Sequence, residues 1–173
     1  MSALKPEFLY TDSVMAAPFF IKTSFDLCTG CSLCQPACSQ RLLGGYNPHR
    51  ALLRIRHSRE NLYHHPVVCN QCTNAYCANV CPVGAIGRHP VTGALEVDPT
   101  VCIGCNLCER YCPIGVVGVD PGLKKSVKCD LCQGAPRCVA ACPTGALKLA
   151  VHRDDEGDVA SDRDGTKEVG HDG

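Results

Sequence analysis

Sixteen cysteines dominate this 173-residue sequence, and they fall into four groups of four. In each central group three cysteines lie close together and a fourth stands directly before a proline, at Cys81-Pro82 and Cys112-Pro113. Thiolates are soft ligands, and three on a short loop followed by a fourth before proline is a spacing that holds cubic 4Fe–4S clusters. The chemistry that these residues favour is therefore iron–sulfur binding and electron transfer.

In the bacterial ferredoxin pattern, which the two central groups resemble, the fourth cysteine ligates the other cluster of a pair. The predicted ligand sets are Cys69, Cys72, Cys77 and Cys112 for one cluster, and Cys102, Cys105, Cys108 and Cys81 for its neighbour. The few residues before each fourth cysteine suit one short helical turn, which proline ends because it has no N–H. Residues 83–86 and 94–97 are predicted to form a hairpin.

The first and fourth groups are left to pair with each other, because the central groups complete one another. Their predicted ligand sets are Cys28, Cys31, Cys34 and Cys142 for one cluster, and Cys129, Cys132, Cys138 and Cys38 for the other. Ser39, not proline, follows Cys38, so the chain is expected to run on, towards a half-exposed strand at 52–56. Further strands are expected at 19–21 and at 144–149.

These pairings predict an α+β fold of two ferredoxin-like two-cluster modules, one inserted into the other, with little regular secondary structure. The expected parts are an N-terminal arm (1–19), a first module (20–65 and 121–150), a second module (66–120) and a polar, acidic C-terminal tail (151–173). Aromatic residues make up only 5% of the chain, so the clusters should supply much of the core. One hypothesis is that the tail packs against another chain, such as a second copy.

The formal net charge of zero counts cysteine as neutral. Four thiolates around an oxidised cluster leave about −2, so four clusters bring the protein to about −8, which disfavours nucleic-acid binding. The first thirty residues contain no basic region, apolar region or twin arginine of an export signal, and no apolar run is long enough to cross a bilayer. We therefore expect a cytoplasmic protein, whose thiols stay available for metal.

Two basic features leave alternatives open. The stretch that holds Arg50, Arg54, Arg56, Arg59, His57, His64 and His65 is either a solvated strand face or a docking surface for an acidic partner. The lysines at 124, 125 and 128 either stabilise a reduced cluster or keep a loop soluble. Histidine ligation is not expected, because sixteen cysteines already satisfy four clusters.

Taken together, the four groups, over about residues 20–149, resemble the polyferredoxin subunits of molybdenum and tungsten pterin enzymes, such as dimethyl sulfoxide reductase and formate dehydrogenase. The resemblance is carried by Pro36-Ala37-Cys38 without a following proline, and by Pro66-Val67-Val68-Cys69-Asn70-Gln71-Cys72. The short length and the 129–138 segment are most similar to the small electron-transfer subunit of bacterial tungsten-dependent aldehyde oxidoreductases. In this family the first group pairs with the fourth.

The resemblance implies a non-catalytic electron-transfer subunit with four 4Fe–4S clusters. It implies a catalytic partner that carries tungsten- or molybdenum-pterin, a flavin- and NAD-binding partner or ferredoxin, and it allows copies of the chain to stack into a filament. The alternatives are an iron–sulfur redox sensor and a subunit of a formate dehydrogenase or hydrogenase-type complex. A structural zinc protein is disfavoured, because zinc sites usually use two separated cysteine pairs.

Overall fold

The computed structural model of this protein describes residues 19–152. The predicted N-terminal arm (1–19) and C-terminal tail (151–173), with the expected contact between the tail and a second chain, lie almost wholly outside the described residues. Within the described range, none of the helices combines the length and the apolar character that a membrane span requires.

Four two-stranded antiparallel sheets form the strand structure of the described residues. They pair β1 (Phe19–Thr23) with β8 (Leu147–Val151), β2 (Arg54–Ser58) with β3 (Tyr63–Val67), β4 (Ile86–Arg88) with β5 (Leu95–Val97), and β6 (Gly118–Asp120) with β7 (Lys125–Val127). The helices are α1 (Cys34–Leu43), α2 (Tyr76–Asn79), α3 (Leu107–Arg110) and α4 (Arg137–Ala140), with 3-10 turns η1 (Pro48–Arg50) and η2 (Leu131–Gly134). These short elements confirm the predicted α+β class with little regular secondary structure.

Helices α2 and α3 stand just before Cys81 and Cys112, which confirms the helical turns predicted there, and α4 has the matching place before Cys142. The hairpin expected between the central groups is also confirmed, but its first strand starts at Ile86 and not at residue 83. The Cys81 carbonyl accepts a hydrogen bond from the Gly84 N–H at 3.3 Å, and Gly84 has a φ of 62°. Residues 83 and 84, which the sequence predicts to be in the strand, belong to this turn instead.

A matching turn follows the last group, where the Gly145 N–H donates to the Cys142 carbonyl at 3.4 Å. Strand β8 therefore begins at Leu147, and the prediction that a strand starts at residue 144 is wrong by three residues. The strand expected at 19–21 is confirmed by β1, which pairs with β8 and joins the two ends of the described chain.

Helix α1 continues past Cys38, as the absence of proline predicted. The Ser39 side chain is fully buried, and its Oγ donates to the Pro36 carbonyl at 3.1 Å and accepts from the Asn47 N–H at 3.0 Å. The helix ends at Gly44, which has a φ of 66°. The strand expected at 52–56 is β2, and it starts two residues later, at Arg54, after the buried residues 51–53.

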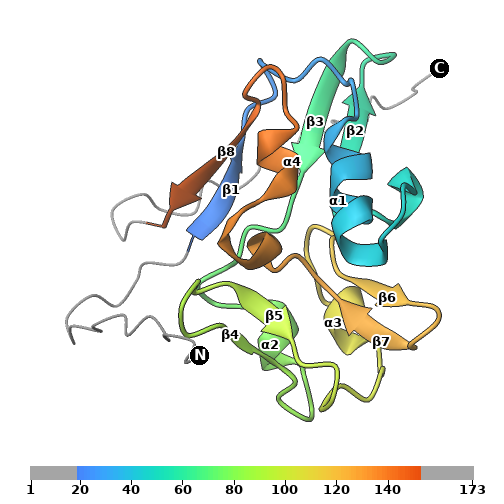
Figure 1. Cartoon of the computed structure of the whole chain (residues 1–173), viewed down its shortest axis with the longest axis vertical. Coiled ribbons are helices and arrows are strands. Elements are labelled where there is room, and N and C mark those ends of the chain that lie inside the picture. Colours follow the sequence, from blue (N-terminus) through green and yellow to red (C-terminus); the bar gives the residue numbers. More distant parts are fainter. Residues whose placement is uncertain (1–18, 153–173) are drawn as a thin grey trace, which may run out of the picture.

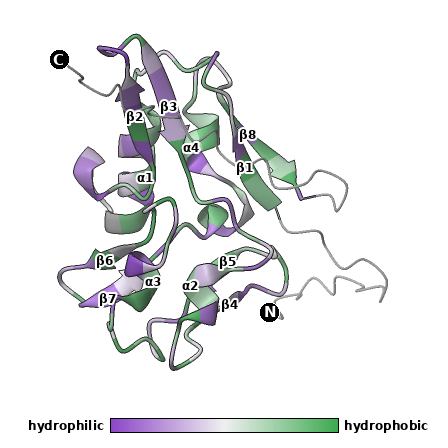
Figure 2. Ribbon diagram, turned by 180° about the vertical axis from the view of Figure 1, so that it is seen from behind, coloured by the Kyte–Doolittle hydropathy of each residue, from purple (hydrophilic) through white to green (hydrophobic). Residues whose placement is uncertain are grey.

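The elements occupy two halves in Figure 1: β1, β8, α1, α4 and the β2–β3 hairpin lie above, and β4 to β7 with α2 and α3 lie below. Each half has a small core, one containing Ile21, Leu53 and Leu147 and the other containing Ile86 and Leu95. The β2–β3 hairpin is coloured largely as hydrophilic in Figure 2, in contrast to β1 and β8. The proposed module boundary between residues 120 and 121 falls in the turn of the β6–β7 hairpin.

Candidate metal centres

Site A is a pocket, partly open to solvent, with about 300 Å³ of empty space between the first and last cysteine groups. It is lined by Cys28, Cys31, Cys34 and Cys142. Burial is the main cause that raises the pKa of Cys34 to about 11, and the neighbouring thiols, with Cys142 first among them, contribute to that rise. The sequence assigns these four cysteines to one cluster, and the structure brings them to one cavity; their role as ligands stays a prediction.

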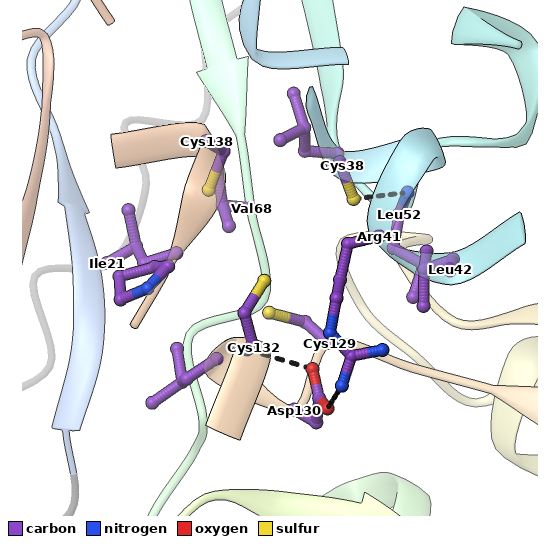
Figure 3. A pocket seen from close by; sticks show the side chains of 13 residues that line it. Ile21, Cys38, Arg41, Leu42, Leu52, Val68, Cys129, Asp130, Cys132 and Cys138 are labelled. Carbon is purple, nitrogen blue, oxygen red and sulfur yellow. Dashed lines mark hydrogen bonds and ion pairs between the residues drawn. The ribbon is translucent and has the colours of Figure 1, made fainter. Parts of the chain in front are cut away.

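Site B is a pocket, partly open to solvent, with about 400 Å³ of empty space, and it is lined by Cys38, Cys129, Cys132 and Cys138 (Figure 3). Burial, together with the neighbouring thiols of Cys38 and Cys132, raises the pKa of Cys138 to about 12. Since Cys38 comes from α1 and the other three from the last group, this cavity joins residues nearly a hundred positions apart, as the predicted crosswise pairing requires.

An aspartate orders the loop at site B. One oxygen of Asp130 accepts the Cys132 N–H at 2.9 Å, and the other forms an ion pair with Arg41 of α1 at 3.2 Å (Figure 3). Cys132 and Gln133 have left-handed φ values of 50° and 59°, which turn the chain sharply within η2. The Leu52 N–H also donates to the Cys38 Sγ at 3.4 Å, a contact that favours a thiolate.

Site D is a pocket, partly open to solvent, with about 290 Å³ of empty space in the lower half of the molecule. It is lined by Cys81, Cys102, Cys105 and Cys108. Burial acts to raise the pKa of Cys102, but hydrogen bonds involving Ser126 and Gly104 outweigh it, so the pKa lies below its ordinary value. A Cβ on Gly104 would stand 2.1 Å from the Lys124 carbonyl oxygen, so this ligand loop requires glycine.

Site C brings together Cys69, Cys77 and Cys112. Burial raises the pKa of Cys77, the charge of Lys128 opposes the shift, and the Cys69 and Cys112 thiols add to it. The sequence assigns Cys72 to the same site, and its carbonyl accepts a hydrogen bond from the Arg88 side chain at 2.6 Å.

The four sites follow one another in the order A, B, C, D. Cys34 of site A and Cys138 of site B lie in one buried cluster. Burial raises the pKa of Cys129 in site B, and the thiol of Cys69 in site C adds to that shift, so these sites are neighbours across the two halves. Cys108 of site D packs in a buried cluster with two cysteines of site C.

Exposure separates the ends of this series from its middle. Cys31 of site A and Cys105 of site D are exposed, whereas the cysteines of sites B and C are buried or half-buried. Apolar side chains stand beside both exposed cysteines: Leu33 is 51% exposed and Ile103 is 62% exposed. Among the four sites, A and D are therefore the ones with a cysteine exposed on the surface of the described chain.

The donor chemistry fits iron–sulfur clusters. Sites A, B and D each offer four cysteine sulfurs, and backbone N–H groups point at two of them, Ala85 to the Cys81 Sγ at 3.3 Å and Leu52 to Cys38. Hydrogen bonds to sulfur are a usual way to stabilise such clusters. Over residues 19–152, no three His, Cys, Asp or Glu side chains are arranged to hold a single metal ion.

Several members of the basic stretch are engaged inside the chain. Arg50 forms an ion pair with Asp120 at 2.9 Å, and Arg54 donates to the carbonyls of residues 49, 51 and 53. Nδ1 of His57 lies 2.8 Å from Nδ1 of His64. These contacts engage part of the stretch within the chain, which favours the strand face over the docking surface that the sequence left open.

The two halves are connected by Gln71 and Lys128, and neither residue was predicted to have this role. Gln71 is the first of them. Its side chain is fully buried, its Nε2 donates to the Cys129 carbonyl at 2.7 Å, and its Oε1 accepts the Leu95 N–H at 2.7 Å. Nothing in the sequence marks it, because a glutamine in a loop is ordinarily exposed. The second, Lys128, lies against the same two residues.

We expect Gln71→Ala to destabilise the cluster-loaded protein by about 2 kcal/mol, because a buried N–H loses its partner. A change of this size should lower the Tm by about 4–8 °C in a chain of this length, measured by anaerobic circular dichroism. Asn79→Ala is the control, since that exposed side chain bonds only to Asn74 and should change stability by less than about 0.5 kcal/mol. Equal Tm values for the two variants would contradict the bridging role.

Comparisons with known proteins agree with this chemistry. A family described as 4Fe-4S dicluster domain matches residues 60–152, and a second family with the same description matches residues 27–85. The chain is 40% identical over 139 residues to YsaA of Escherichia coli, named as an electron transport protein, covering 75% of this chain and 87% of that one.

Two further relatives are subunits of named enzymes. Formate hydrogenlyase subunit 2 of Escherichia coli is 30% identical over 174 residues, covering 78% of this chain and 83% of the relative. The beta subunit of NADH-dependent phenylglyoxylate dehydrogenase of Aromatoleum evansii is 36% identical over 123 residues, covering 70% of this chain but only 28% of the relative. The similarity therefore spans most of this chain and differing shares of its relatives.

Proposed function

This chain belongs to the 4Fe-4S dicluster domain family, and on that premise we propose that it relays electrons between a tungsten- or molybdenum-pterin oxidoreductase and a flavin- and NAD-binding subunit or ferredoxin. At the coarser level, it is a protein of two ferredoxin-like dicluster domains with four 4Fe–4S clusters that transfers electrons in an oxidoreductase complex. The catalytic partner that we propose is a tungsten-dependent aldehyde oxidoreductase. In this proposal the chain itself is non-catalytic and cytoplasmic.

The observation that carries the proposal is the succession of cysteine sites from exposed site A to exposed site D. Each cluster, when bound, takes up and releases an electron. Electron tunnelling weakens exponentially with distance, so neighbouring sites replace one long transfer with short ones. The chain's residues hold these positions, leave no cysteine of sites B and C exposed, and direct N–H groups at sulfur.

The two exposed ends also suit more than one partner. We propose that the pterin enzyme docks at one end and the flavin subunit or ferredoxin at the other, with Leu33 and Ile103 as apolar contacts. If a second copy docks instead, site D of one chain can face site A of the next, and a filament would extend the relay. The NADH-dependent relative supports an electron route that ends at a nicotinamide.

An anaerobic stopped-flow experiment tests the function. Mixing the oxidised protein with an aldehyde-reduced tungsten aldehyde oxidoreductase should bleach the visible absorbance of its clusters within the turnover time of the enzyme. Leu33→Glu and Ile103→Glu should each slow electron exchange with one partner by about tenfold or more, which corresponds to about 1.4 kcal/mol of lost docking energy. Val91→Glu, at a 78% exposed position in the β4–β5 turn, should have no effect.

The alternatives give different results in the same assay. Bleaching by a formate- or hydrogen-fed enzyme, but not by the aldehyde enzyme, would favour the second candidate, a subunit of a formate dehydrogenase or hydrogenase-type complex, which the formate hydrogenlyase relative supports. Failure of every pterin enzyme and hydrogenase to reduce the protein would overturn the relay and leave the redox sensor.

A further inference from the structure

Lys128 is the one buried charged side chain among residues 19–152, with 5% of its surface exposed. Lysine is almost never fully buried unless its charge has a partner. Its Nζ donates to the Leu95 carbonyl at 2.6 Å and to the Cys129 carbonyl at 3.0 Å. Both acceptors are neutral, and within the described residues no ion pair joins Lys128 to an acidic side chain.

The surroundings of this ammonium show what balances its charge. Burying an isolated charge is strongly unfavourable, so a fold that keeps one supplies opposite charge nearby. Lys128 bonds to the backbone of Cys129, a residue of site B, and to that of Leu95, which packs in one buried cluster with Cys77 and Cys112 of site C. Loaded sites carry about −2 each, so the ammonium lies near two negative centres.

Gln71 joins the same two segments of the chain as Lys128 does. Its side chain bonds to the same two residues that Lys128 contacts, the Cys129 carbonyl and the backbone N–H of Leu95. Leu95 belongs to β5, so the amide and the ammonium together connect the lower half to the last cysteine group. A charge held by two hydrogen bonds acts without reorganisation when an electron arrives.

The other two lysines of this segment serve as comparisons. Lys124 is exposed, and Lys125 is half-buried with its Nζ bonded to the carbonyl of Cys102 at site D. The two roles considered for these lysines therefore fall to different residues. Lys128 is placed to stabilise a reduced cluster, and Lys124 is placed to keep the loop soluble.

We propose that Lys128 is a fixed internal cation that raises the reduction potentials of the clusters at sites B and C, and so favours electrons at the junction between the two modules. This inference rests on the proposed function, because it gives the junction its place in the relay. A positive charge in a low-dielectric interior stabilises a negative charge that arrives nearby. Since Lys128 lies near both sites, it lowers the energy of the reduced cluster at site B and at site C together.

The test is an anaerobic redox titration followed by electron paramagnetic resonance on variants with full iron content. Lys128→Met should lower two of the four midpoint potentials. We expect the equilibrium constant for reduction of each of these clusters to fall about tenfold, which is a shift of about 59 mV for one electron. Lys128→Arg keeps the charge and should restore both values. Lys124→Gln makes the same change in net charge on the surface and should leave all four unchanged.

Several results would overturn the inference. These are unchanged potentials in fully loaded Lys128→Met, or an equal shift at all four clusters. If Lys128→Met loses iron, Lys128→Gln serves as the second variant, because it keeps a hydrogen-bonding group without the charge. Loss of iron from both variants, with full iron in Lys128→Arg, would show that the charge is required for cluster assembly and would also reject the redox role. Shifted potentials in a protein that no oxidoreductase reduces would reject the proposed function alone.

Discussion

Removal of iron under reducing conditions should abolish the cooperative thermal transition of this protein. The prediction follows from what fills the interior. Of the twenty buried hydrophobic residues in the described chain, five are alanine and five are cysteine, and no aromatic ring is among them. Such side chains bury little apolar area, so hydrophobic burial alone supplies little of the free energy of folding.

The two cores depend on cysteines that are expected to bind iron. Cys34 and Cys138 belong to the buried cluster of the upper half, and Cys108 belongs to that of the lower half. When metal-binding cysteines are part of a core, the free energy of metal binding becomes free energy of folding. Without iron these positions become small thiols around unfilled space, which cannot offset the conformational entropy of the chain.

The measurement is a far-ultraviolet circular dichroism melt of loaded and chelated protein, with iron and sulfide added back as the control. We expect a sigmoidal transition for the loaded protein, a nearly linear trace after chelation, and recovery of the transition on reconstitution. A chelated protein that melts with a similar amplitude and midpoint would show that the polypeptide folds without its clusters.

Combining Cys112→Ala with a second cysteine substitution should show which ligands share a cluster. Under crosswise ligation, Cys112 belongs to site C although it stands in the third sequence group. Cys112→Ala alone should therefore remove about four iron atoms per chain. Adding Cys72→Ala should remove no more iron, because both residues are assigned to the same cluster.

Adding Cys105→Ala to Cys112→Ala should instead remove about eight iron atoms, because Cys105 lines site D. The comparison is a double-mutant cycle with iron per chain as its readout, and its non-additivity identifies ligands that act as one unit. If each sequence group held its own cluster, the Cys112→Ala variant with Cys72→Ala would lose about eight iron atoms, and the variant with Cys105→Ala would lose about four. That outcome would reject the crosswise assignment at sites C and D.

Local sequence signals were enough for the short elements around the cysteines. The turn before each Cys-Pro pair and the hairpin after Cys81 were predicted, because proline and glycine restrict the backbone within a few residues. The β2–β3 and β6–β7 hairpins were not predicted. Their pairing depends on partners such as His65 opposite Arg56, polar residues whose pattern resembles that of a loop.

The sequence by itself determined the chemistry, since the number and spacing of sixteen cysteines predict four clusters before any coordinate is known. It also determined the α+β class, because loops this short leave room only for single turns and brief strands. Only the tertiary structure decided the order of the four sites and the exposure of Cys31 and Cys105 at the two ends of that series. It also decided the burial of Lys128 between the two halves of the molecule. The physical reason is that ligand spacing acts over a few bonds, whereas burial and electrostatic proximity arise only when distant segments pack together.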